Sequence, residues 1–227
     1  MDPVAGAGVI VDRRGEHSVW QETPVRLFLA ALVPLAIAAP LRALAFADAS
    51  PVTVLFLGPA LEESLKLSGV ILVLTVASLA LRGGRDPALV LRYWLFLAPW
   101  IVGGLYGMME GIVGYPGQGG LDFTLRELAH ATFVALSLGG ALRIWRLLDA
   151  PLFGIGFGFA AGFSAHLWFN ALAFLSDYVD VSFVDQVAYL AIVLVLTLVV
   201  LASEVRREPA SAEARAFLPS RGRSLHP

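Results

Sequence analysis

Residues 184–203 read VDQVAYLAIVLVLTLVVLAS, and Asp185 is the only charged residue among them. A helix needs about 20 mostly apolar residues to cross the hydrocarbon core of a bilayer. Five further stretches are long and apolar enough to cross it, at about 25–46, 52–81, 88–114, 123–147 and 151–175. They are too long for membrane strands and lack the alternating pattern of a barrel. Because lipid tolerates only helices and closed barrels, we predict an all-α membrane bundle of about six transmembrane helices.

The composition of the whole chain also points to a membrane protein. Of its 227 residues, 58% are hydrophobic and 15% are charged, and the mean hydropathy is +0.76. Soluble domains carry about 25% charged residues, so this chain has too few charges to cover a soluble surface. A net charge of −2 argues against a nucleic-acid partner. The chain has no Cys, which excludes disulfides and thiolate metal sites.

Basic residues gather on one side of the predicted spans. Three lie at or before the start of the first span, three follow the second, two end the fourth and five follow the sixth, which makes thirteen of the sixteen. Cytoplasmic segments carry such an excess, so we expect a multi-pass protein of the cell membrane with both termini in the cytoplasm. The predicted parts are a polar tail at 1–24, one membrane domain at 25–203 and a flexible tail at 204–227.

Several spans contain polar residues that lipid does not tolerate. A charge at the bilayer centre costs roughly 2.5–3.5 kcal/mol on insertion scales. Such groups usually face the interior of the bundle and mark a functional site. The candidate site residues come from four different spans and are Glu62, Glu63, Glu110, His130, His166 and Asn170.

The candidate residues are expected at similar depths in the membrane. With a rise of about 1.5 Å per residue, Glu62 and His166 lie roughly 15 Å below the outer face. By the same measure Glu110 and His130 lie roughly 6–10 Å below it. We therefore expect one site in the outer half of the bilayer, where the lipid bilayer is itself a partner of the protein.

The spacing within the second and fifth spans adds detail. Lys66 follows Glu63 by three residues and Glu62 by four, so it can reach either carboxylate. The two glutamates point about 100° apart on a helix, and two adjacent carboxyls in a low dielectric do not readily both ionise. We expect one of them to hold a proton or pair with Lys66 while the other faces the site. His166 and Asn170 are four apart and share a helix face.

Three kinds of chemistry fit this set of residues. In the first, Glu62 is the general base that activates water, and His166 and Asn170 donate to the developing oxyanion. In the second, two carboxylates and two imidazoles hold Zn²⁺ with a bound water, and the candidate ligands are Glu62, Glu110, His130 and His166. In the third, the same groups form a proton or ion relay.

Four short motifs occur in order on separate spans: EESLK at 62–66, GMMEG at 107–111, HATF at 130–133 and HLWFN at 166–170. Together they resemble the PrsW family of intramembrane proteases, a branch of the CAAX-protease and bacteriocin-processing superfamily. The resemblance covers about residues 56–175.

The resemblance implies hydrolysis of a peptide bond in a membrane-anchored protein with a single transmembrane span. The substrate of such an enzyme is an anti-sigma-factor-like protein, cut near its extracytoplasmic face. Glu62 and Glu63 match the paired glutamates of the family, and Glu110, His130, His166 and Asn170 match its other polar positions. The family resemblance leaves the choice between a glutamate and a metal mechanism open. The alternatives are an ion-coupled transporter that uses the same cluster and a non-catalytic membrane binding protein of the same fold.

Overall fold

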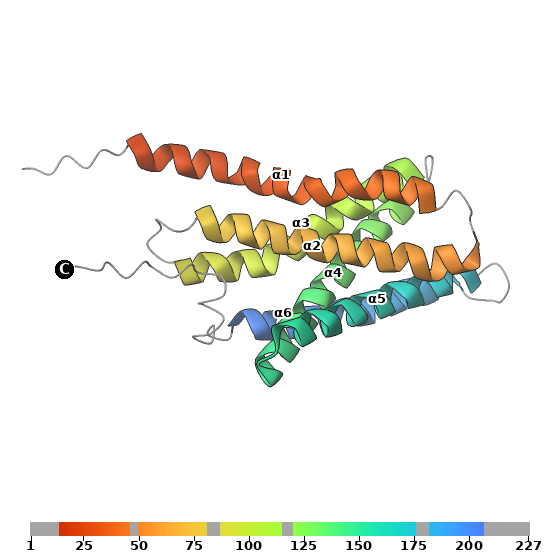
Figure 1. The fold of residues 1–227 in the computed structure, drawn as a ribbon. Helices are drawn as coiled ribbons and strands as arrows, with labels where there is room; N and C mark the ends of the chain where they lie inside the picture. Colours follow the sequence, from red (N-terminus) through yellow and green to blue (C-terminus); the bar gives the residue numbers. More distant parts are fainter. Residues whose placement is uncertain (1–13, 46–49, 81–86, 115–119, 176–181, 207–227) are drawn as a thin grey trace, which may run out of the picture.

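The computed structural model describes residues 14–45, 50–80, 87–114, 120–175 and 182–206, and no strand occurs in these ranges. A π-helix, η1 (Thr53–Leu57), leads into the second of six long helices. These helices are α1 (Arg14–Ala45), α2 (Gly58–Ala80), α3 (Pro87–Gly114), α4 (Gly120–Leu148), α5 (Pro151–Leu175) and α6 (Phe183–Arg206) (Figure 1). The predicted all-α class is confirmed.

Four of these helices are long and apolar enough to span a membrane: Leu91–Ile112, Phe123–Leu148, Pro151–Leu175 and Phe183–Arg206. The apolar stretch of α1 is shorter, at Val25–Ala38. Helix α2 has 23 residues, but three of them are charged. Those three side chains are buried inside the bundle, so their charge does not meet lipid.

Two predicted boundaries differ from the structure. Helix α1 begins at Arg14, inside the predicted tail at 1–24. Helix α6 continues to Arg206, and the side chain of Glu204 within it is fully buried, so the predicted tail at 204–227 begins too early. Residues 1–13 and 207–227 of the two predicted tails lie outside the described residues.

Local sequence explains where the helices begin. Pro87 and Pro151 occupy the first positions of α3 and α5, where a missing N–H costs no helical hydrogen bond. Before α6, the Ser182 N–H donates to Asp185 Oδ2 at 2.8 Å, and the Asp185 N–H donates back to Ser182 Oγ at 3.4 Å, which is a reciprocal cap. Between α4 and α5 the chain turns through Asp149, whose φ of 49° lies in the left-handed region.

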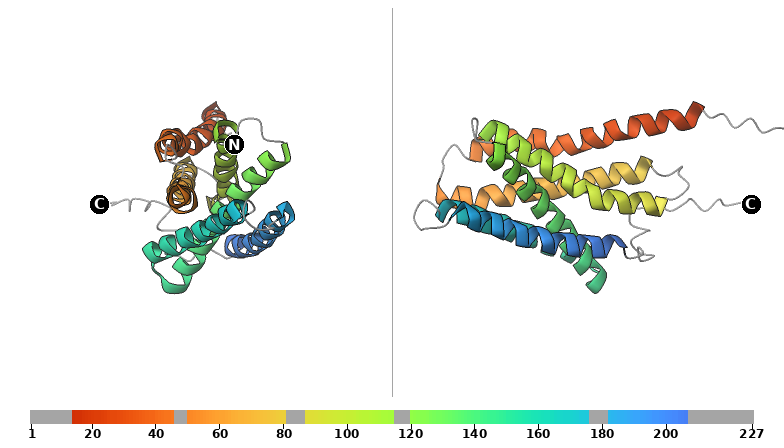
Figure 2. Two further views of the ribbon diagram at one scale, coloured as in Figure 1. Left: turned by 90° about the vertical axis from the view of Figure 1, so that its right-hand side faces the viewer. Right: turned by 180° about the vertical axis from the view of Figure 1, so that it is seen from behind.

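Helix α4 is the central element of the bundle. It runs obliquely past the other helices (Figures 1 and 2) and contacts α2, α3, α5 and α6. The first turns of α2 and α4 lie at the same end of the bundle as the last turns of α3 and α5, and we call this the site end. The oblique path lets one helix face three elements that carry candidate site residues.

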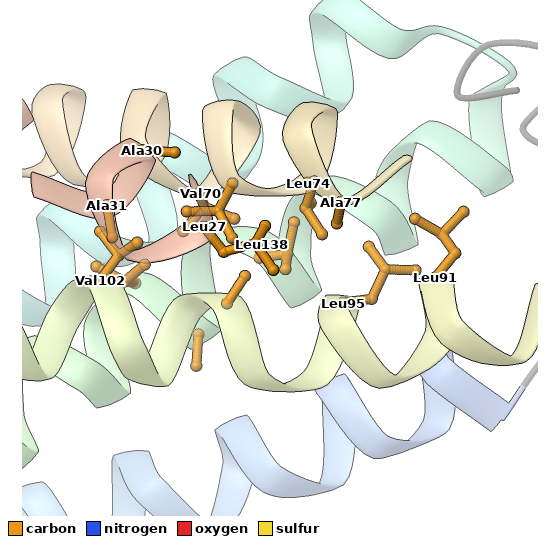
Figure 3. Close-up of a cluster of buried hydrophobic side chains, with 14 of the residues drawn as sticks. Leu27, Ala30, Ala31, Val70, Leu74, Ala77, Leu91, Leu95, Val102 and Leu138 are labelled. Carbon is orange, nitrogen blue, oxygen red and sulfur yellow. The ribbon is translucent and has the colours of Figure 1, made fainter. Parts of the chain in front are cut away.

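The main apolar core lies between α1, α2, α3 and α4. Figure 3 shows Val70 and Leu74 of α2 together with Leu27 of α1, Val102 of α3 and Leu138 of α4. All five side chains are buried. This core fixes the rotation of α2, and that rotation decides which way the glutamates at its start point.

Close packing between α4 and α5 depends on glycine. A Cβ at Gly158 would lie 2.2 Å from the Ser137 carbonyl oxygen, and one at Gly154 would lie 2.6 Å from the Ala141 carbonyl oxygen. Small residues at a four-residue interval let two membrane helices approach this closely. By contrast, Gly156 lies on the other face of α5 and has no heavy atom of the described residues within 4 Å of an added Cβ.

An ion cluster around the buried carboxylate of Glu204 holds α6 to α4 at the end opposite the site end. Arg143 Nη1 donates to Glu204 Oε1 at 3.0 Å, and Arg146 Nη1 donates to Glu204 Oε2 at 2.8 Å. Arg146 Nη1 also lies 2.7 Å from the Glu204 carbonyl oxygen. Two guanidinium groups neutralise one fully buried carboxylate, so its burial does not leave an uncompensated charge.

We expect Gly158→Ala to destabilise the protein by about 1–3 kcal/mol, because the added methyl overpacks the contact with α4. The matched control is Gly156→Ala on the open face of the same helix, which we expect to be neutral or slightly stabilising. Thermal unfolding of both variants in detergent measures the difference. Equal melting temperatures for the two variants would contradict this account of the α4–α5 contact.

Candidate active site

The charged residues of α2 separate into a pair and a single acid. Lys66 Nζ donates to Glu63 Oε1 one turn back along the helix, and both side chains are fully buried. Glu62 is also buried but points in a different direction, with its Oε2 atom 3.8 Å from His166 Nε2. Glu63 is therefore the glutamate that pairs with Lys66, and Glu62 approaches the Nε2 edge of the imidazole of α5.

A second chain of contacts runs from α2 through α4 to α3. Lys66 Nζ lies 2.7 Å from His130 Nδ1, and the other ring nitrogen of His130 contacts Glu110 Oε2. Glu110 Oε1 lies 3.7 Å from Arg126 Nη1, and Arg126 is the partly exposed member of this chain. His130 thus has protein groups against both of its nitrogens.

His166 joins α5 to the same network. Its Nδ1 lies 2.9 Å from Glu63 Oε1, the oxygen that also accepts from Lys66. The His166 ring stacks on Phe133 at 5.4 Å and meets the His130 ring edge-on at 5.1 Å between centroids. These contacts hold the imidazole so that its Nε2 edge faces Glu62.

The structure brings five of the six candidate residues into one connected cluster, which we call the Glu/His cluster: Glu62, Glu63, Glu110, His130 and His166. Asn170 lies one turn along α5 from His166 and is half-buried. Among the described residues, no hydrogen bond joins its side chain to the cluster. Its place on the shared helix face agrees with the spacing, and its role stays a prediction.

Two further side chains support the cluster and were absent from the candidate set. Lys66 links Glu63 to His130, as described above. Tyr106 is fully buried. Its ring centroid lies 5.2 Å from Lys66 Nζ and 6.0 Å from the centroid of the His130 ring. Tyr106 precedes Glu110 by four residues, so the shared helix face was a signal in the sequence that could have identified it.

Glycines set the distance between the helices that carry the cluster. On α3, a Cβ at Gly103 would lie 2.6 Å from the His130 carbonyl oxygen, and one at Gly107 would lie 2.5 Å from Glu127 Cα. On α5, a Cβ at Gly162 would lie 1.9 Å from Ser137 Oγ. Only the absence of a side chain lets α3 and α5 approach α4 closely enough for Glu110 and His166 to meet His130.

Three members of the cluster could hold a metal ion. One ligand atom from each of Glu62, His130 and His166 lies within 4.8 Å of the others. Glu110, which we expected as a fourth ligand, is not in this group and instead contacts His130 Nε2. Zinc binds nitrogen and oxygen at about 2.0–2.2 Å, so the three ligand atoms would have to move closer together, and His130 would have to give up one of its present contacts.

Comparison of the chain with protein-family models, with curated proteins and with solved structures finds no match.

The Lys66–Glu63 pair gives a prediction about stability. We expect Lys66→Met to cost about 3–5 kcal/mol, because it leaves the buried Glu63 without its cation. The double variant Glu63→Gln/Lys66→Met removes both charges, and we expect it to recover most of that loss. Thermal unfolding in detergent of the wild type and both variants tests this. A double variant no more stable than Lys66→Met would contradict the pairing.

Proposed function

We propose that this protein is a multi-pass enzyme of the cell membrane that hydrolyses a peptide bond in a single-span, membrane-anchored protein near its extracytoplasmic face. The observation that carries the proposal is the approach of Glu62 Oε2 to His166 Nε2 at 3.8 Å, with both side chains buried. Two proton acceptors at that separation can both accept from one water molecule placed between them.

The contact between His166 Nδ1 and Glu63 prepares the other nitrogen for this role. In neutral His166 the Nδ1–H donates to the Glu63 carboxylate, so Nε2 carries the lone pair and faces Glu62. A carboxylate that holds an imidazole in one tautomer is the arrangement by which many hydrolases orient a base. Glu63 accordingly acts as a positioning residue, and Glu62 and His166 are the groups that touch the water. This differs from the donor role expected for His166 from spacing.

The proposed reaction needs one proton acceptor and one proton donor in turn. The water oxygen attacks the peptide carbonyl carbon while Glu62 takes a proton from that water. The carbon–nitrogen bond then breaks, and the proton held by Glu62 passes to the leaving nitrogen. Asn170 lies one turn nearer the end of α5, where its amide N–H can donate to the carbonyl oxygen as charge develops there.

The place of the cluster in the bundle supports a reaction on a membrane-embedded substrate. All five clustered residues lie within about ten residues of the helix ends that form the site end. The distribution of basic residues predicts that this end faces the outside. Apolar side chains are exposed along α6 and α5, among them Val195, Val199 and Phe157, as expected for a surface in contact with lipid. The four motifs that resemble the PrsW family carry the same residues.

A zinc-dependent form of the reaction is the second candidate. The observation that favours it is the Glu62, His130 and His166 group. When bound there, zinc would supply a Lewis acid and an activated water. The contacts of both His130 nitrogens with Lys66 and Glu110 favour the metal-free form. An ion-coupled transporter is favoured by a different observation, the continuous chain of titratable groups from Glu62 to the partly exposed Arg126.

We expect Glu62→Gln to reduce cleavage at least 100-fold, because a positioned general base contributes about 10²–10⁴-fold to such reactions. The matched control is Glu127→Gln, since Glu127 lies on α4 outside the Glu/His cluster. The assay is cleavage of a panel of single-span membrane proteins by the purified enzyme in liposomes.

Cleavage by the Glu62→Gln variant at the wild-type rate would overturn this assignment. Absence of cleavage across a broad panel by folded wild-type protein would count against an enzyme. Proton or ion flux in the same liposomes, lost in Glu62→Gln, would then favour the transporter.

The metal question has a direct test. We expect cleavage by the wild type to be unchanged after incubation with a strong zinc chelator, because the proposed water is held by Glu62 and His166 without a metal. Loss of cleavage with the chelator, followed by recovery on adding Zn²⁺, would instead assign the zinc-dependent mechanism. As a control, mass spectrometry of the purified protein shows whether it contains a metal before the chelator is added.

A further inference from the structure

Lys66 makes a contact that a salt bridge to Glu63 does not require. Its ammonium group is fully buried and lies 2.7 Å from His130 Nδ1 while it also donates to Glu63 Oε1. An ammonium has three donors and no acceptor, so the ring nitrogen that it meets must be the acceptor. His130 Nδ1 therefore carries a lone pair, and the proton of the neutral ring lies on Nε2.

The partner of His130 Nε2 agrees with this assignment. That nitrogen contacts Glu110 Oε2, and an ionised carboxylate only accepts hydrogen bonds. A proton on Nε2 satisfies the carboxylate, whereas a proton on Nδ1 would leave two donors against each other at Lys66 and two acceptors against each other at Glu110. Both contacts of the ring thus select the same tautomer.

The same ion pair favours the opposite tautomer in the second imidazole, that of His166. Glu63 Oε1 accepts from Lys66 and also from His166 Nδ1–H, at 2.9 Å. His166 consequently has its proton on Nδ1 and its lone pair on Nε2. The two histidines, whose rings meet edge-on at 88°, are held in opposite tautomers by one lysine and one glutamate.

We propose that Lys66 is a positioning residue that sets the tautomer of His130 and, through Glu63, that of His166. In the hydrolysis proposed above, on which this role depends, it leaves Glu62 and His166 Nε2 as the acceptors at the reacting water. It also occupies the lone pair of His130 Nδ1, while the Nε2 proton donates to Glu110. No lone pair of His130 then remains for a metal.

The test combines a spectroscopic measurement with activity. Full-length protein labelled with ¹⁵N-histidine in detergent reports whether each ring nitrogen carries a proton, and the loss of one set of signals in His130→Gln assigns His130. In the wild type we expect a bare Nδ1 and a protonated Nε2 for His130, with the reverse for His166. Lys66→Arg keeps a donor-only cation, so we expect it to keep the His130 pattern.

We expect Lys66→Met to lose the fixed His130 pattern and to lower kcat by about 10–100-fold with little change in KM, by analogy with the loss seen when a residue that orients a metal-ligating histidine is removed. We expect Lys66→Arg to recover at least part of that kcat. If Lys66→Met does not fold, the double variant Glu63→Gln/Lys66→Met takes its place in the measurement of the His130 spectrum, because it removes the cation without leaving a buried unpaired charge.

A proton on Nδ1 of wild-type His130, or an unchanged pattern in the variant that lacks Lys66, would overturn the inference. These spectra need no substrate, so they separate the two proposals. Expected tautomers in a folded protein that cleaves nothing would contradict the peptidase and leave in place the assignment that Lys66 sets the two tautomers. Cleavage by a protein whose histidines have the opposite tautomers would support the peptidase and contradict the role of Lys66.

Discussion

The buried ion pair between Lys66 and Glu63 is the interaction on which the rest of the site depends. Each charge alone would be too costly in the interior of a membrane bundle, and together they present one shared oxygen and one ammonium to two histidines on neighbouring helices. Helices α4 and α5 are thereby joined to α2 by polar contacts, while apolar packing joins α2 to α1 and α3. Helix α2 therefore carries residues of both the site and the apolar core.

The close approach of α3 and α5 to α4 is the second constraint, and glycines make it possible because they have no side chain. At Gly107 on α3 and Gly158 on α5, backbone meets backbone across the interface with α4. Carboxylates and imidazoles have a short reach, so contacts such as those of His130 and His166 need their helices this close. The glycines in the motif GMMEG and in the run before HLWFN belong to the site as much as its acids do.

Much of the fold could be predicted from the sequence, because helix length in a membrane is set by bilayer thickness. The span expected at 151–175 coincides with α5. The burial of Glu204 could not be predicted, since it depends on Arg143 and Arg146, which lie far from it along the chain. Likewise, spacing on α2 allowed Lys66 to pair with either glutamate. The choice of Glu63 follows from the rotation of α2 against its apolar core and from the position of His166, which no local pattern encodes.

The two-residue connection through Asp149 and the glycine contacts at Gly154 and Gly158 hold α4 and α5 closely together. Glu62 belongs to α2, and its 3.8 Å approach to His166 crosses the contact between α2 and α5. In the proposed peptidase, any movement that parts α2 from α5 to admit a polypeptide substrate must also separate Glu62 from the imidazole of His166. For the proposed peptidase, admission and reaction would therefore be successive events, with the reactive geometry restored only after α2 and α5 come together again around the substrate.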